Sequence, residues 1–222
     1  MVLFFRLKVR KNVFRNLYKK SVVINNPVYI GYNDYRIPKI RRKIIVNVGR
    51  LHRQKNQQLL INAFAKISDI FPDYNLEIFG DGELREVLIE QIEQLHLQNR
   101  VILKGTTKNL LSEIADASLF VLSSDYEGMP NALMEAMALG LPCISTDCKP
   151  GGARELINSG KNGLIVKRNS VEELAKAMEF MLKNKEEAEM MGKNAKEICN
   201  THSFKKIIYK WEEFVMNLDN YR

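Results

Sequence analysis

The sequence predicts an α/β fold, a doubly wound parallel sheet of six strands followed by C-terminal helices. Three observations support this prediction. Short apolar and β-branched runs recur from residue 44 onward, a glycine-containing turn follows most of them, and apolar residues at helical spacing come next. Because the runs are apolar throughout rather than alternating, we expect a parallel sheet with helices on both faces.

The elements follow in order along the chain. The candidate strands are 44–48 (IIVNV), 76–79 (LEIF), 101–104 (VILK), 119–122 (LFVL), 142–146 (PCIST) and 163–166 (GLIV). Pro130 and Gly140 fit the first turn and the end of a helix over about 130–139. Ser170 is a candidate N-cap for a helix over 171–184, and a second helix reaches about Cys199. A last helix over 204–218 carries an apolar stripe of Phe204, Ile207, Ile208, Trp211, Phe214 and Val215.

Composition is that of a globular protein that folds in water. The 222 residues are 45% hydrophobic and 27% charged, without an apolar run near the ~18 residues that a membrane span needs. Cations interrupt the opening segment before a leader sequence could form, so we expect a cytoplasmic protein. The cysteines, Cys143, Cys148 and Cys199, are an odd number without zinc-like spacing and are interpreted as reduced and structural.

Basic residues concentrate at the front of the chain. Residues 1–53 hold 14 lysines or arginines and one acid, Asp34, within a net charge of +8 for the whole chain. No aromatic-interleaved basic strand or recognition helix accompanies them, which argues against nucleic-acid binding. Either this is a solvated or interdomain surface, or residues 1–20 attach peripherally to anionic lipid at the inner face of a membrane.

Charged and glycine-rich loops follow the candidate strands, where open α/β sheets bind their ligands. The first loop, GRLHRQKN, offers Arg50 and Lys55 across a turn that opens a helix, an arrangement suited to a diphosphate without a metal. Two ordinary surface cations are the alternative. The second loop, GDGELR, has Arg85 at the third glycine position of the dinucleotide fingerprint, so a nicotinamide enzyme is disfavoured.

The loop SSDYEGMPN places Glu127 just before the predicted helix and Glu135 within it. The free amides at the start of that helix, from Gly128 to Leu133, would form an anion site reinforced by the helix dipole. Acids near a helix start are favourable in any protein, but an acid among the apolar residues of ALMEAMAL is costly without a partner. Two acceptors around one anion site suit a nucleotide sugar.

The motifs GRLHRQKN, GDGELR, EGMPNALMEAMALGLPCIST and NGLIV resemble the donor-binding half of glycosyltransferase family 4, whose GT-B fold has two Rossmann-like domains. The resemblance covers about residues 22–218. It implies that Arg50, Lys55 and Gly49 hold the nucleotide diphosphate, that Glu127 is the catalytic carboxylate that contacts the transferred sugar, and that Glu135 accepts from the ribose hydroxyls. It also implies contacts to sugar and phosphates from Gly128, Met129, Pro130, Asn131, Ala132 and Leu133, and to the base from Lys104, Gly105 and Thr106.

The family resemblance further implies a retaining, metal-independent hexosyltransferase without a cofactor. The donor would be a UDP-hexose or UDP-N-acetylhexosamine, and the acceptor a glycan or lipid-linked glycan in surface polysaccharide synthesis. Residues 1–30 resemble the last helix of an acceptor domain and the interdomain linker, residues 31–200 the donor-binding domain, and residues 201–222 the helix that crosses back. Most of the acceptor domain has no counterpart in this chain, so we expect inactivity unless a separate domain completes it.

Other hypotheses remain open from the sequence. The chain could be a non-catalytic nucleotide-sugar-binding module, or a fragment of a GT-B epimerase. The epimerase is disfavoured because His52, His96 and His202 make no convincing general base. A homodimer that buries the surfaces left by the absent domain is an alternative to a separate acceptor domain.

Overall fold

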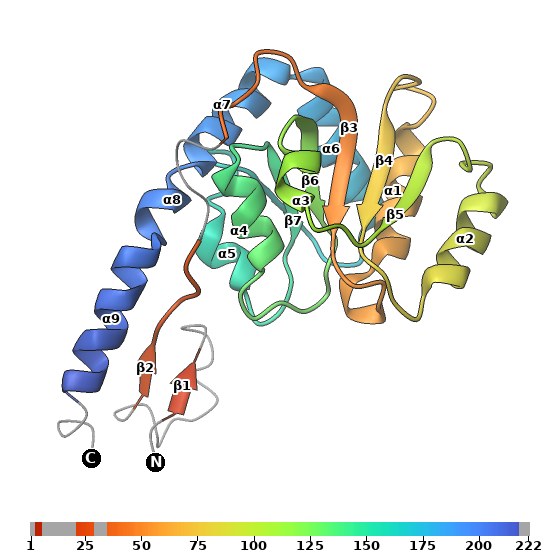
Figure 1. Cartoon of the computed structure of the whole chain (residues 1–222). Helices are drawn as coiled ribbons and strands as arrows, with labels where there is room; N and C mark the ends of the chain where they lie inside the picture. Colours follow the sequence, from red (N-terminus) through yellow and green to blue (C-terminus); the bar gives the residue numbers. More distant parts are fainter. Residues whose placement is uncertain (1–2, 6–20, 29–34, 218–222) are drawn as a thin grey trace.

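A computed structural model describes residues 3–5, 21–28 and 35–217 of the chain (Figure 1). Its main sheet has six parallel strands in the spatial order β5-β4-β3-β6-β7-β8. The strands are β3 (Arg42–Val48), β4 (Asn75–Phe79), β5 (Val101–Gly105), β6 (Ala117–Leu122), β7 (Cys143–Thr146) and β8 (Leu164–Val166). Each of the six predicted strands is present, and the predicted fold class is confirmed.

The strand order reverses between β3 and β6, which are neighbours in the sheet but are separated in sequence by β4 and β5. Connections leave these two strands in opposite directions, so a crevice opens beyond their carboxyl ends. In Figure 1 this edge of the sheet lies at the bottom, where the arrows of β3 and β4 point. The loops after β3 and β6 therefore border the crevice in which open α/β sheets bind their ligands.

Helices cover both faces of the sheet (Figure 1). One face packs against α1 (Gln57–Ile67), α2 (Arg85–Gln94) and α6 (Val171–Lys183). The other packs against α3 (Leu110–Ile114), α4 (Asn131–Ala138), α5 (Gly152–Leu156) and α8 (Ile198–Thr201), while α7 (Lys185–Ala195) contributes to both clusters. The predicted cap of α6 is confirmed, because the Ser170 hydroxyl accepts from the Glu173 amide at 3.2 Å.

Helix α4 is bounded by the residues that the sequence singled out. Pro130 is the residue before its first turn rather than within it. At the other end Gly140 adopts a left-handed φ of 72°, which glycine tolerates without strain. The amides of Gly140 and Leu141 donate to the carbonyls of Met137 and Ala136 at 2.9 and 3.1 Å, so the last carbonyls of the helix are satisfied.

The ends of the described chain lie side by side, away from the main sheet (Figure 1). Strands β1 (Leu3–Phe5) and β2 (Ser21–Val23) form a separate parallel pair, and Ile24 packs against Ile207 and Phe214 of α9 (Phe204–Met216). Within residues 1–30, which resemble a helix followed by a linker, Leu3–Phe5 forms a strand instead of helix, and the other residues of 1–20 lie outside the described residues. Of the predicted stripe on α9, Ile207 and Phe214 alone are buried.

All three cysteines are buried and unpaired, as the sequence indicated. Burial raises the pKa of the Cys148 thiol to about 11 and raises that of Cys143 further, so both are protonated near neutral pH. Each helix in the described part of the chain is too short or too polar to cross a bilayer.

Candidate functional site

The loops that follow β3 and β6 are joined by hydrogen bonds at the carboxyl edge of the sheet. The amide of Asp125 donates to the Gln54 carbonyl at 2.9 Å, and the Gln54 side chain donates to the Tyr126 carbonyl at 2.6 Å. The Ser123 hydroxyl donates to the Lys55 carbonyl at 2.8 Å. Because these bonds anchor backbone groups on both sides of the crevice, the positions of the two loops depend on each other.

This junction brings together two of the predicted site residues, Lys55 and Glu127. The Lys55 ammonium lies 2.5 Å from Oε1 of Glu127, and the side chains are 23% and 8% exposed. The Ser124 hydroxyl donates to the same carboxylate oxygen at 2.7 Å. Glu127 is thus more buried than its expected place at the mouth of the loop, and it is held by one charged and one neutral donor. Two residues far apart in the sequence form one charged unit.

The start of α4 adjoins this unit. The first helical bond runs from the Met134 amide to the Pro130 carbonyl at 3.1 Å, so the amides of the preceding turn have no acceptor within the helix. Gly128 leads into this turn, and a Cβ built on it would meet no atom within 4 Å. The predicted segment Gly128–Leu133 therefore combines free amides with open space beside Glu127.

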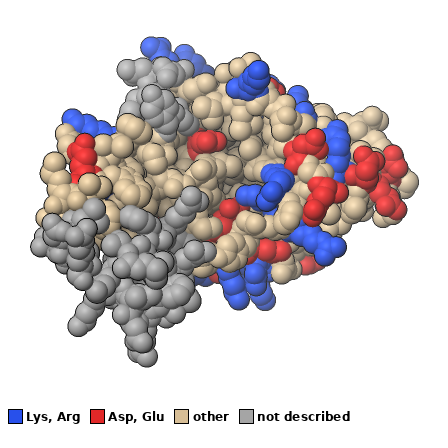
Figure 2. Space-filling view, turned by 60° about the horizontal axis from the view of Figure 1, so that its bottom comes forward, with Lys and Arg blue, Asp and Glu red and all other residues tan. Residues whose placement is uncertain are grey.

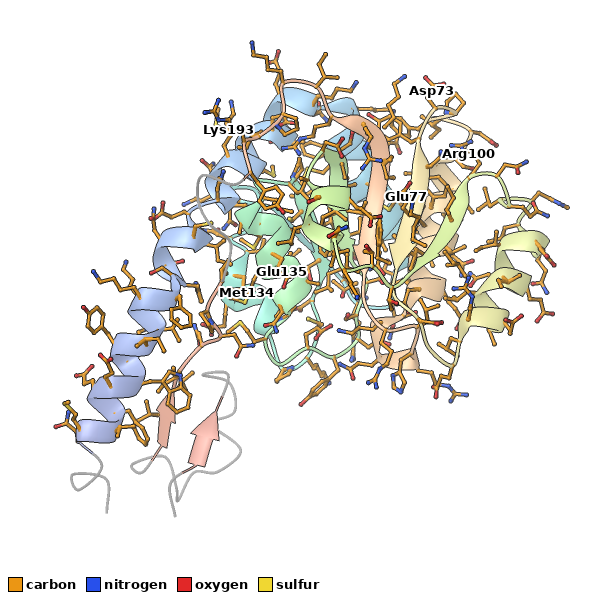
Figure 3. All side chains as sticks on the ribbon, in the orientation of Figure 1. Asp73, Glu77, Arg100, Met134, Glu135 and Lys193 are labelled. Atoms are coloured by element: carbon orange, nitrogen blue, oxygen red, sulfur yellow. The ribbon has the colours of Figure 1, made fainter. Side chains whose placement is uncertain are left out.

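Glu135 lies further along α4 and is half-buried (Figure 3). Burial raises the pKa of its carboxyl, and in the described chain that carboxylate makes no hydrogen bond or ion pair. It is therefore less enclosed than the apolar sequence around it suggested. The ionised carboxylate still loses hydration without gaining a partner, which is unfavourable in the protein alone.

Arg50 has an exposed side chain on the loop after β3, and a buried glutamine supports its backbone. The Gln57 side chain donates to the Arg50 carbonyl at 3.1 Å and approaches the Gly49 carbonyl at 3.5 Å. Gly80, with φ of 132°, packs so closely that a Cβ there would lie 2.1 Å from the Gly49 oxygen. Gln57 was not predicted from the sequence, because its polar side chain at the start of a helix suggests exposure.

The predicted base-binding segment adjoins the same group of loops. The Gly80 amide donates to the Gly105 carbonyl at 2.7 Å, which links the end of β5 to the loop after β4. The Lys104 ammonium lies 4.0 Å from Glu77 and 5.8 Å from the centre of the Phe79 ring, and Thr106 is exposed. Residues 104–106 therefore lie at the same edge as the Lys55–Glu127 pair, although their contacts in the described chain are with β4 and its loop.

Figure 2 turns this edge toward the reader and shows basic and acidic side chains interspersed rather than gathered into one basic surface. Among the described residues, histidine, cysteine and acidic side chains form no cluster of three that could hold a metal ion. The roles assigned to Arg50, Glu127, Glu135 and the α4 amides stay predictions.

The sequence matches the model of the family described as Glycosyl transferases group 1 over residues 36–198. It is 32% identical to an uncharacterized glycosyltransferase of Methanocaldococcus jannaschii, over 94% of this chain and 58% of that protein. It is also 32% identical to a Campylobacter jejuni N-acetylgalactosaminyltransferase that is named for a diphospho-undecaprenol acceptor, over 75% of this chain and 45% of that enzyme. The chain thus spans about half the length of such relatives.

Solved structures share the fold. A mutant of S. aureus TarM, in complex with fondaparinux, α-GlcNAc-glycerol and UDP, aligns with a TM-score of 0.86 at 24% identity, over 96% of this chain and 43% of that one. Anabaena HepE in complex with UDP and glucose aligns with a TM-score of 0.87 at 21% identity, over 97% of this chain and 63% of that one. With its doubly wound sheet and the family match across most of its length, the chain belongs to the glycosyl transferases group 1 family.

Proposed function

We propose that this chain is the donor-binding half of a retaining glycosyltransferase that takes a UDP-hexose or UDP-N-acetylhexosamine. The observation that carries the proposal is the Lys55–Glu127 pair, which lies at the strand-order reversal beside the first turn of α4. A nucleotide sugar would account for both charges: its diphosphate would lie beside the free amides of α4 and the Lys55 ammonium, and its sugar would face the Glu127 carboxylate. The solved complexes of TarM and HepE contain UDP, which supports this nucleotide.

Each part of the donor has a candidate partner. The diphosphate would lie between the α4 amides and the side chains of Arg50 and Lys55. Glu127 would accept from hydroxyls of the transferred sugar, and Glu135 from the ribose, giving its half-buried carboxylate the donors that it lacks in the described chain. The base would rest against residues 104–106.

The proposed reaction breaks the bond between the sugar and the diphosphate. Negative charge grows on the departing nucleoside diphosphate, and fixed positive charge from Arg50 and Lys55, with the helix dipole, would stabilise it. Positive charge grows on the sugar in an oxocarbenium-like transition state, which the Glu127 carboxylate would stabilise. These groups need neither a metal nor a cofactor for that purpose. Retention of the anomeric configuration is proposed from the family resemblance.

A second domain would supply the acceptor site. The chain spans 58% of its M. jannaschii relative, and the β1–β2 pair is a two-stranded parallel sheet, which is rarely stable without further strands or covering helices. We therefore propose that an acceptor-binding domain packs against β1, β2 and α9. The C. jejuni relative is named for a lipid-linked acceptor, which supports a glycan or lipid-linked acceptor and peripheral membrane attachment here.

Calorimetric titration with UDP tests the donor site. We expect Arg50→Ala and Glu135→Ala each to weaken binding about tenfold or more, since each removes a charge-assisted contact. Arg36→Ala and Glu93→Ala, at exposed positions outside the candidate site, serve as matched controls and should leave binding unchanged. Absence of binding up to millimolar UDP would contradict the proposed function.

A complementation assay tests the reaction. Adding a separately produced acceptor domain from a relative should yield sugar transfer, and product analysis with UDP-N-acetylglucosamine separates transfer from epimerisation. UDP binding without transfer in any such mixture would favour the non-catalytic module instead.

A further inference from the structure

Two donors converge on one oxygen of Glu127 and leave the other oxygen accessible. The Lys55 ammonium and the Ser124 hydroxyl both bind Oε1, at 2.5 and 2.7 Å. In the described chain Oε2 has no hydrogen-bond partner. The side-chain atoms there that are both fully buried and unpaired belong to Asn47, Gln57, Gln91 and Asp125, and Oε2 is not one of them. Oε2 therefore keeps contact with solvent.

We propose that Ser124 is a positioning residue that fixes the Glu127 carboxylate so that Oε2 faces the sugar of the donor. This inference rests on the proposed function and deepens it, because it assigns sugar discrimination to a residue that does not itself contact the ligand. A carboxylate with both oxygens free can rotate about its last side-chain bond, whereas one with Oε1 anchored presents a single oxygen in one direction.

Ser124 is itself held rigidly. It is 1% exposed, and the hydroxyl of Thr146 on β7 donates to the Ser124 carbonyl at 2.5 Å. The next strand of the sheet therefore fixes the backbone that carries the hydroxyl. A buried hydroxyl at a fixed distance from a carboxylate oxygen constrains that carboxylate more than a flexible lysine can.

Lys55 and Ser124, the two hydrogen-bond donors to Oε1, should respond differently when a nucleotide sugar binds. Lys55 ends in an ammonium on a flexible stem and is attracted toward any diphosphate that enters the crevice. Ser124 is neutral and buried, so a diphosphate exerts no comparable pull on it. If Lys55 turns toward the phosphates, Ser124 is the donor that keeps Oε1 in place.

The test compares UDP with UDP-glucose, UDP-galactose, UDP-N-acetylglucosamine and UDP-N-acetylgalactosamine on the whole chain, by calorimetry. We expect Ser124→Ala to keep UDP affinity within about twofold while the spread of affinities among the four sugars narrows about tenfold, the effect of one hydrogen bond to a charged group. Ser124→Cys, which retains a weak donor, should give an intermediate spread. Ser145→Ala is the matched control, because this equally buried hydroxyl on β7 binds the Thr146 carbonyl instead.

The outcomes separate the two proposals. A wild-type chain that binds neither UDP nor any UDP-sugar overturns the proposed function together with the role of Ser124. A wild type that binds UDP but does not discriminate among the sugars, or a Ser124→Ala variant that discriminates as well as wild type, overturns the positioning role alone. Equal loss of UDP and UDP-sugar binding in Ser124→Ala would show a general structural effect and would also overturn it.

Discussion

Replacing Gly128 with alanine tests whether glycine is needed at this position for the ligand to approach the backbone or for the chain to fold. Gly128 does not have a left-handed φ, and a Cβ at this position would meet no atom within 4 Å. The fold therefore has no steric reason for glycine there. If the backbone beside Glu127 closely approaches the sugar and phosphates, the added methyl group occupies their space.

The structure sets the expected magnitudes. Alanine at a permitted conformation stabilises a protein by about 0.4–1 kcal/mol through the unfolded chain, which raises Tm by about 1–4 °C at this size. Losing one close contact to a charged ligand weakens binding about tenfold to a hundredfold. Gly128→Ala should thus combine unchanged or higher stability with weaker UDP-sugar binding.

Gly152→Ala is the complementary variant: unlike Gly128→Ala it should lower stability, and the backbone shift that it forces at Gly128 and Glu127 should also weaken UDP-sugar binding. A Cβ on Gly152 would lie 2.5 Å from the Gly128 oxygen and 2.9 Å from the Glu127 oxygen, so the backbone must shift to accommodate it. Overpacking of this kind costs about 1–3 kcal/mol and lowers Tm by several degrees. Thermal unfolding and calorimetric titration measure both quantities. A Gly128→Ala variant that binds UDP-sugar as tightly as wild type would refute the reasoning.

Three further substitutions test other parts of the site. Burial raises the pKa of Glu135 above its ordinary value of 4.5, so ionisation of this carboxyl destabilises the unliganded fold. The free energy of unfolding should therefore fall as the pH rises above 4.5, and Glu135→Gln should remove the corresponding fall in Tm. Lys55→Met leaves Glu127 buried beside an apolar side chain and should cost about 3 kcal/mol in urea unfolding, much of which Glu127→Gln in the same chain should restore. Gln57→Leu should weaken UDP binding about fivefold in calorimetry, because the Arg50 carbonyl loses its donor.

The strands and most helices were predictable because their patterns are local. A buried parallel strand must be apolar on both faces, and a helix that packs on a sheet must repeat its apolar residues every three or four positions. The limits of α4 followed in the same way from Pro130 and Gly140. By contrast, β1 and the limited burial of α9 depend on which surfaces meet near the chain ends, and residue patterns alone do not determine that.

Pairing across the crevice was not predictable for a different reason. The contact between Lys55 and Glu127 joins residues 72 positions apart and depends on β3 and β6 being neighbours. The sequence indicated a charged residue in each loop, but not that they would share one hydrogen-bonded unit. The sequence does not distinguish Ser124, whose hydroxyl donates to the Glu127 carboxylate, from Ser123, whose hydroxyl donates to the Lys55 carbonyl.

The pairing also explains how the site can hold strong charges before a ligand arrives. An unpaired Glu127 at 8% exposure would be destabilising, and an isolated Lys55 would attract any anion. Together they neutralise each other, and an ammonium has three donors, so Lys55 can bind Glu127 and a phosphate oxygen at once. In the proposed function a diphosphate would add to this charged pair, and Ser124 would hold Oε1 of Glu127 if Lys55 turned toward the phosphates. Because the loops after β3 and β6 are already hydrogen-bonded to each other, the proposed donor would need to order them little further on binding, which would favour affinity.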